Sequence, residues 1–330
     1  MKTTITKAVV AVAMTLGAGS AHAEEGITLV LNWVPTADHM PYFYAKSQGW
    51  YTEAGIDLNI EVGRGSSAAA QKVGVGMAPF GIADMSTLML AKAQGADVKA
   101  VMAVYANSPQ GFYWLKSRGI NSPEDFPGHS IGNPPADASR ALWPLFAETV
   151  KIDPDTVKFV NIAPQAKMAS LKSGAIDITS DFYNEHDVKL REFGDDLGFV
   201  AWRDIGLNSY GNSLFVNGAY EKANPEVVSA FVAVTQRAFA ACVASADPCI
   251  DAIMADVSGL SRDNQTDQWT RIKELMTDPT TTTEGLGFFD PARVASDYQL
   301  VSTYLELAEP FEPDTLFSNA GLDPAVKMPE

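Results

Sequence analysis

The chain has 330 residues, of which 46% are hydrophobic, and its 24 basic and 40 acidic side chains give a formal net charge of −16. So acidic a surface is unsuited to nucleic acid and is typical of a soluble protein. The length exceeds that of one ordinary domain, so we expect two lobes with separate cores.

The first 23 residues have the parts of a secretory signal peptide. Lys2 and Lys7 form a short basic start, residues 8–16 form an apolar core, and the segment ends in Ala-His-Ala. The apolar core is too short to span a bilayer, and no later stretch approaches about twenty uninterrupted apolar residues. No cysteine stands at the cleavage point, so a lipid anchor is not indicated. We expect cleavage after Ala23 and a location in the periplasm.

A βαβ unit is predicted for residues 27–62. The apolar, β-branched run at residues 27–31 is typical of a buried strand, and Asn32 and Trp33 follow it directly. A helix is expected from about residue 41 to residue 48, and a second strand over residues 57–62. Because open α/β sheets bind ligands beyond the carboxyl ends of their strands, Asn32 and Trp33 are candidate ligand contacts.

Further βα junctions follow in the first third of the chain. A turn rich in glycine and serine leads into a helix at residues 68–74, which Ser66 can cap. Residues 80–83 and 98–104 are the next predicted strands, with a helix over residues 84–94 between them. These junctions indicate an α/β lobe with a parallel sheet.

The alternation of helices and strands continues beyond the first lobe. The pattern predicts a helix at residues 138–150, a strand at 157–161, a helix at 165–173, strands at 176–181 and 213–217, and a long helix capped at residues 224–226 that reaches about residue 244. Residues 279–283, a proline followed by four threonines, are expected to form only a polar loop.

The chain has two cysteines, Cys242 and Cys249, separated by six residues. In an oxidising compartment this spacing predicts a local disulfide that closes the Asp247-Pro248 turn between two helices. A metal site would need histidines or further cysteines nearby, and none is present in this stretch.

The opening of the chain resembles the bacterial periplasmic solute-binding proteins related to the yeast thiamine-pyrimidine synthase. The shared motif is N-W-x-P-x-x-x-H, then a helix, then G-W/Y-Y/F-x-x-x-G-I/L-D, carried here by Asn32, Trp33, Pro35, His39, Gly49, Trp50, Tyr51, Gly55, Ile56 and Asp57. The resemblance continues through residues 122–132 and 287–293 and covers nearly the whole mature chain.

The resemblance implies an α/β fold of the two-lobed, type II periplasmic binding class. Each lobe would be a mostly parallel sheet flanked by helices, with the ligand in the interlobe cleft. Residues 111–116 match the strand by which the family crosses between lobes. We therefore expect the first lobe to comprise residues 24–112 and 213–330, and the second lobe residues 113–212.

The resemblance and the predicted strand ends together suggest a set of ligand contacts, with part of the second lobe's share coming from a helix start at residues 133–139. The candidates are Asn32, Trp33, His39, Tyr42, Ser66, Asp84, Asn133, Tyr183, Asn184, Glu185 and Tyr210. Trp33 and Tyr183 suit stacking on a flat heteroaromatic ring, and Asp84 or Glu185 would accept hydrogen bonds from ring amines. Loop packing remains an alternative role for Trp33, and helix capping for His39 and Asp84.

The function implied by the resemblance is that of the substrate-binding component of an ABC importer. The expected ligand is a thiamine-pyrimidine precursor or a related planar heterocycle, and the expected partners of this monomer are a membrane permease and its ATPase. A sulfonate, taurine or nitrate is the alternative ligand class, bound by helix-start amides with Arg64 or Arg140. Pro79 replaces an acid usual in the family, which weakens any transfer of ligand identity.

Enzymatic activity is not expected. In the yeast synthase branch, a lysine holding pyridoxal phosphate and a reacting histidine stand where this chain has Ala83 and Thr87, and residues 206–211 replace a cysteine-rich loop. Without that amine, imidazole or thiol the reaction has no apparatus, so we predict no cofactor and no metal. The alternative is an exported enzyme that uses Asp84 and Glu185 as an acid/base pair.

Overall fold

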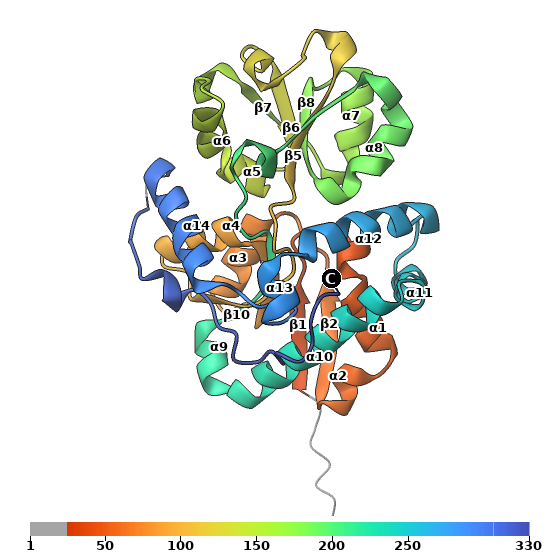
Figure 1. Cartoon of the computed structure of the whole chain (residues 1–330), viewed down its shortest axis with the longest axis vertical. Coiled ribbons are helices and arrows are strands. Elements are labelled where there is room, and N and C mark those ends of the chain that lie inside the picture. The colour runs from red at the N-terminus through yellow and green to blue at the C-terminus, as the bar shows by residue number, and fades with distance from the viewer. Residues whose placement is uncertain (1–24, 306, 330) are drawn as a thin grey trace, which may run out of the picture.

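Two five-stranded sheets divide the molecule into two lobes, one above the other in Figure 1. The computed structural model describes residues 25–305 and 307–329, so the predicted signal peptide, residues 1–23, lies outside the described residues. Helices flank both sheets. The predicted two-lobed α/β fold is confirmed.

The first sheet has the order β2-β1-β3-β10-β4. Its strands, in that order, are Ile56–Glu61, Glu25–Val30, Phe80–Asp84, Asn212–Asn217 and Val98–Ala103. β1 pairs in parallel with β2 and β3, whereas β10 is antiparallel to β3 and β4. Only β10 is reversed, so the carboxyl ends of the other strands meet at one edge of the sheet.

The second sheet repeats this plan with the order β7-β6-β8-β5-β9. Its strands, in that order, are Lys158–Asn161, Ser130–Asn133, Ile178–Phe182, Gln110–Leu115 and Leu197–Ala201. β5 is the reversed strand and pairs with β8 and β9. The expected boundary between residues 112 and 113 falls inside β5, so the chain enters the second sheet slightly earlier than predicted.

The helices lie on the faces and edges of the two sheets (Figure 1). The α-helices are α1 (Met40–Ser47), α2 (Trp50–Glu53), α3 (Ser66–Gly74), α4 (Met85–Ala93), α5 (Ala138–Ala141), α6 (Trp143–Thr149), α7 (Lys167–Ser173), α8 (His186–Phe193), α9 (Gly218–Ala223), α10 (Pro225–Ala244), α11 (Asp247–Asp256), α12 (Arg262–Met276), α13 (Pro279–Thr283) and α14 (Pro291–Tyr304). Three short 3₁₀ helices border the cleft: η1 (Ala37–His39), η6 (Tyr183–Glu185) and η8 (Trp202–Ile205).

Two helix predictions were wrong. The single helix expected at residues 138–150 is broken into α5 and α6, because Pro144 in the first turn of α6 has no N–H for a continuing helix. Residues 279–283 form α13 rather than a loop, because Asp278 and Thr281 make a reciprocal cap. The Thr281 N–H donates to Asp278 Oδ1 at 2.8 Å, and the Asp278 N–H donates to Thr281 Oγ1 at 3.0 Å.

The core of the first lobe includes α10, which by length and composition alone could cross a membrane. Here its buried face, with Phe231, Val232 and Phe239, packs into the hydrophobic core of the first lobe. At its end, Cys242 is bonded to Cys249 of α11, which confirms the predicted disulfide. α10 is therefore a core helix of the lobe in this structure.

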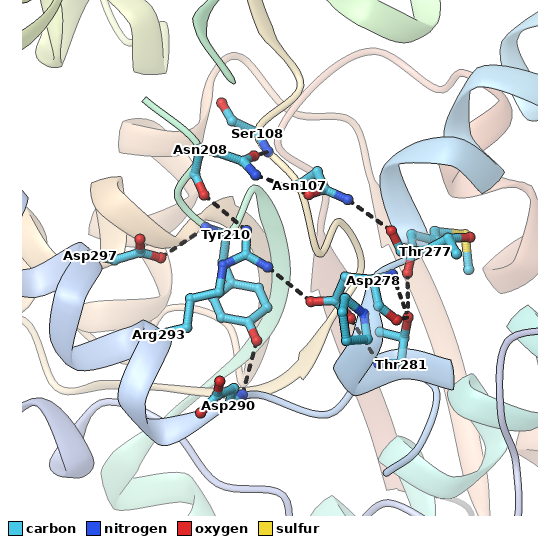
Figure 2. Close-up of polar contacts among 12 residues, drawn as sticks. Asn107, Ser108, Asn208, Tyr210, Thr277, Asp278, Thr281, Asp290, Arg293 and Asp297 are labelled. Carbon is cyan, nitrogen blue, oxygen red and sulfur yellow. Dashed lines mark hydrogen bonds and ion pairs between the residues drawn. The ribbon is translucent and has the colours of Figure 1, made fainter. Parts of the chain in front are cut away.

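The chain passes between the lobes twice, through residues 105–109 and residues 207–211, and side chains join these two crossing segments (Figure 2). The Asn208 amide donates to Asn107 Oδ1 at 3.0 Å, and the Ser108 N–H donates to Asn208 Oδ1 at 2.8 Å. The two connections therefore form one unit.

Arg293 of α14 fixes the second crossing segment to the first lobe (Figure 2). Its guanidinium donates to the Asn208 carbonyl at 2.8 Å and to Asp278 Oδ2 at 2.9 Å, and lies 4.3 Å from the ring centroid of Tyr210. The Tyr210 N–H donates to Asp297 Oδ2 at 2.9 Å. The second crossing segment is thus held to the first lobe by Arg293 and Asp297 of α14.

Candidate functional site

A cavity with about 490 Å³ of empty space, including its opening, lies between the lobes. The first lobe lines it with Asn32, Trp33, Thr36, Asp38, Gly65 and Ser66; the second lobe lines it with Gln110, Asp137, Ala138, Lys167, Ser180, Asp181, Phe182, Asn184 and Glu185. Both lobes therefore contribute to one enclosed site.

The lobes touch closely at one edge of the cavity. Gly65 has a φ of +127°, and a Cβ there would lie 2.2 Å from the Ala136 carbonyl oxygen of the other lobe. The neighbouring Ser67 N–H donates to the same oxygen at 3.3 Å. Glycine at position 65 permits this approach, which any side chain would block.

Two aromatic rings stand in the cavity wall, one from each lobe. Trp33 follows β1 in the first lobe, and Phe182 ends β8 in the second lobe. Phe182 packs edge-on against Tyr105, with ring centroids 6.1 Å apart. Aromatic rings in a cavity wall can each contact a flat ligand.

Lys167, at the start of α7, is a buried cation in the cavity wall. Its ammonium donates to Asp137 Oδ2 at 3.1 Å, to the Ser180 carbonyl at 2.7 Å and to Asp181 Oδ1 at 3.4 Å. Burial lowers the pKa of Lys167, but the attraction of Asp137 and Asp181 together outweighs it, so the pKa lies above its ordinary value. Lys167 is therefore charged, and its three donors are committed to the protein.

The acceptors at the other side of the cavity come from η6. Glu185 accepts a hydrogen bond from Gln268 Nε2 of α12 at 2.7 Å, and burial raises the pKa of its carboxyl group. Asn184 is 3% exposed, and its amide oxygen has no hydrogen-bond partner among the described residues. Because a buried acceptor without a partner costs free energy, Asn184 is suited to a ligand donor.

A chain of polar side chains orients Asn32. Its amide donates to Asn212 Oδ1 at 3.2 Å, and its oxygen lies 3.0 Å from His39 Nε2. His39 Nδ1 accepts the Thr36 N–H at 3.1 Å, and burial lowers the pKa of the imidazole. A neutral His39 with its proton on Nε2 therefore donates to Asn32; His39 supports the cavity and does not line it.

Five of the sequence-predicted ligand residues thus line the cavity: Asn32, Trp33, Ser66, Asn184 and Glu185. Two others lie in the protein interior. Tyr42 is on the buried face of α1, packed edge-on against Phe239. Asn133 is fully buried, and its amide donates to the Ser139 and Ser180 hydroxyls.

Asp84, Tyr183 and Tyr210 are the remaining predicted residues outside the cavity. Asp84 caps α4 by accepting the Ser86 N–H, and also accepts from Gln110 Nε2. Tyr210 belongs to the second crossing segment. Phe182 lines the cavity and Tyr183 does not; the Tyr183 hydroxyl accepts from Arg271 Nη1 at 2.7 Å, and its ring stacks on Phe199.

Sequence reasoning missed Thr36, Asp38, Gln110, Lys167, Ser180, Asp181 and Phe182. Asp137 lay within the helix start that the sequence singled out, and it caps α5. Gln110 and Phe182 occupy strand ends, and this position could have identified them as candidate ligand contacts. Lys167 carries no such signal, because a lysine at a helix start is usually exposed.

The two arginines considered for an anion site do not line the cavity. Arg140 donates to Asn161 Oδ1 and lies over the Phe159 ring, and Arg64 is exposed. Within residues 25–305 and 307–329, no three His, Cys, Asp or Glu side chains are placed to hold a metal ion.

A model of the family described as NMT1/THI5 like matches residues 36–248 of this chain. The 4-amino-5-hydroxymethyl-2-methylpyrimidine phosphate synthase of Legionella pneumophila is 30% identical over 64% of this chain and 67% of its own length. The formylaminopyrimidine-binding protein of Halalkalibacterium halodurans is 22% identical over 71% of each chain. A riboflavin-binding protein of Chloroflexus aurantiacus is 26% identical over 68% of this chain and 64% of its own.

Solved structures share the fold. A protein of Bordetella bronchiseptica superimposes with a TM-score of 0.73 and 21% identity over 90% of this chain and 95% of its own. The periplasmic aliphatic sulphonate-binding protein of Escherichia coli superimposes with a TM-score of 0.62 and 13% identity, covering 85% of this chain and 86% of its own.

Proposed function

The chain belongs to the NMT1/THI5-like family, and from this premise we propose that it is a periplasmic solute-binding protein that captures a thiamine-pyrimidine precursor or a related planar heterocycle. The ligand enters between the lobes and is enclosed when they close. An inner-membrane ABC permease and its ATPase are the partners that would receive the solute.

The observation that carries the ligand class is the chemistry of the cavity wall. Phe182 and the part of the Trp33 indole that Lys167 leaves uncovered offer ring surface, while Asn184 and Glu185 offer acceptors to the amine edge of a heterocycle. The cation in the wall, Lys167, has its donors occupied by Asp137, Ser180 and Asp181. A small anion would therefore meet carboxylates without a free cationic donor, which favours an uncharged or cationic solute.

Relatives support the same class of ligand. Two of the similar proteins are named for binding formylaminopyrimidine and riboflavin, both planar heterocycles. The Legionella relative is instead named as a pyrimidine phosphate synthase. Our proposal is binding alone for this chain, because the resemblance places Ala83 and Thr87 where the yeast synthase branch has its cofactor lysine and reacting histidine.

Calorimetry on Glu185→Gln tests the ligand class. The panel comprises formylaminopyrimidine, 4-amino-5-hydroxymethyl-2-methylpyrimidine, thiamine, riboflavin, taurine, an alkanesulfonate and nitrate. Glutamine keeps the acceptor for Gln268 but removes the charge, so affinity for an aminopyrimidine should fall by roughly 10- to 150-fold. The control Glu192→Gln changes an exposed carboxylate on α8 and should leave binding unchanged. Binding of an anion by wild type, with none of any heterocycle, would overturn the proposal.

A further inference from the structure

Helix α12 of the first lobe carries a row of polar residues that contacts the second lobe across the cleft. The residues are Asn264, Asp267, Gln268 and Arg271, whose spacing of three and four places them on one face of the helix. In Figure 1, α12 lies along the top of the first lobe, below α8. We call this row the α12 clasp.

The opposite face of α12 is fixed to the first lobe. Trp269 is 1% exposed, and its indole N–H donates to the Cys242 carbonyl at 3.1 Å. At the end of the helix, the Asn107 N–H donates to the Leu275 carbonyl at 2.9 Å, and its amide donates to the Thr277 carbonyl at 2.9 Å (Figure 2). The helix that carries the clasp is thus tied directly to a crossing segment.

Arg271 makes the strongest contact of the clasp. Its Nε and Nη2 donate to the two carboxylate oxygens of Asp187 on α8, at 2.7 and 3.0 Å, and Nη1 donates to the Tyr183 hydroxyl at 2.7 Å. These hydrogen bonds hold the pKa of Asp187 below its ordinary value. The paired hydrogen bonds to one carboxylate add geometric specificity to this contact between the lobes.

Arg191 adds a second contact, in which the arginine comes from the second lobe and its partners from the first. This residue of α8 donates to Asn264 Oδ1 at 2.6 Å and also pairs with Asp267. Both partners lie on α12, Asp267 one turn and Asn264 two turns before Arg271. Each lobe therefore gives one arginine to the other lobe.

Gln268 connects the clasp to the cavity. Its Oε1 accepts the Ala37 N–H at 3.3 Å, which leaves its Nε2 to donate to Glu185 Oε1 at 2.7 Å. Gln268 is 4% exposed and does not line the cavity. Its amide is therefore oriented from the first lobe, and it holds a cavity carboxylate of the second lobe in place.

We infer that the α12 clasp holds the two lobes closed without any ligand, and that Gln268 is a positioning residue that presents Glu185 to the solute. The lobes would then be partly closed before the solute binds. Side chains that do not contact the solute would set part of the time for which it stays bound. Exposed ion pairs contribute little singly, but Arg271 and Asp187 are only 27% and 24% exposed and act with their neighbours. The role of Gln268 rests on the proposed function; the closure of the free protein does not.

Small-angle X-ray scattering on the ligand-free protein tests the closure directly. Arg271→Ala and, independently, Asp187→Ala should each increase the radius of gyration, and the exchange Arg271→Asp with Asp187→Arg should recover part of the closed form. Arg262→Ala is the matched control, because this arginine lies on the same helix but pairs with Asp247 and Asp251 of its own lobe. Equal radii for wild type and both alanine variants would overturn the closure, whatever the solute is.

Stopped-flow dissociation of formylaminopyrimidine tests the positioning role. Gln268→Ala should speed dissociation about tenfold or more, since Glu185 loses its partner, and Arg271→Ala about three- to tenfold. A Gln268→Ala variant that alters scattering but leaves the dissociation rate unchanged would overturn the positioning role and retain the clasp. If wild type does not bind formylaminopyrimidine, the dissociation is measured with whichever heterocycle of the panel binds; failure to bind every heterocycle overturns the ligand proposal and leaves the scattering result standing.

Discussion

The ammonium of Lys167 lies 4.4 Å from the ring centroid of Trp33, although the two residues belong to different lobes. The cation covers part of the indole from the side of the second lobe, where Asp137 and Asp181 hold it. Closure of the cleft therefore brings a fixed charge against the aromatic wall of the site.

Lys167→Met should destabilise the ligand-free protein by about 3 to 5 kcal/mol. The substitution leaves buried Asp137 without a cationic partner and leaves Asp181 with Lys189 alone, at 2.8 Å; removing one partner of a buried ion pair costs more than the pair contributed. Urea unfolding followed by circular dichroism measures the change. Lys172→Met, on the exposed side of the same helix, should cost less than about 1 kcal/mol. Equal losses in the two variants would show that Lys167 is not holding a buried network.

Phe182→Ala and Trp33→Ala should each weaken binding of a planar heterocycle by roughly 5- to 150-fold, because each removes a ring face from the cavity wall. Isothermal titration gives the affinities. Phe159→Ala truncates an aromatic residue of the second lobe outside the cavity and serves as the control. Unchanged affinity in both cavity variants would eliminate stacking as a source of binding.

Stability should rise as the pH falls from about 7 to about 5, because burial raises the pKa values of Asp84 and Asp297 to about 6. The folded state then binds protons that the unfolded state, with ordinary carboxyl pKa values, does not. Asp297→Asn should therefore stabilise the protein at pH 7 by roughly 2 to 3 kcal/mol and flatten this rise. Urea titrations at pH 5 and pH 7 measure the free energy of unfolding of both proteins. An unchanged pH profile in the variant would contradict the raised pKa of Asp297.

Loss of the Cys242–Cys249 disulfide should lower the free energy of unfolding by about 2 to 3 kcal/mol at most, since the closed loop is short. Binding should persist, because neither cysteine lines the cavity. The double Cys→Ser variant and the wild-type protein are compared by urea unfolding and calorimetry. Abolished binding in a folded variant would mean that the bridge positions α12, whose Trp269 bonds to Cys242.

Local sequence signals predicted most strands of the first sheet and the polar residues that follow β1. The run of residues 27–31 and the polar residues after it correctly placed Asn32 and Trp33 at the edge of the first sheet. Signals of this kind depend on short-range pattern and turn chemistry, which can be read from the sequence without the tertiary structure. Helices α8, α9, α12 and α14 and strand β9 were not predicted.

Contacts between distant segments could not be predicted in the same way. Phe182 and Tyr183 are adjacent aromatic residues, and residue type alone does not tell which of the two rings lines the cavity. Gln268 lies on an amphipathic helix, where a polar side chain ordinarily faces water; its contact with Glu185 exists only because the lobes meet. Lys167 is likewise buried in an ion-pair network with Asp137 and Asp181, and the sequence does not show that these three residues meet.

The position of β10 between β3 and β4 has a consequence for the order in which a nascent chain folds. A chain that has emerged only to residue 211 holds every strand of the second sheet but lacks the strand that joins β3 to β4. We expect the backbone amides of the second lobe to become protected from exchange first. The first lobe is synthesised earlier, but its sheet cannot be completed until β10 has emerged. A fragment ending at residue 211 should show slow amide exchange in β5–β9 and fast exchange in β4.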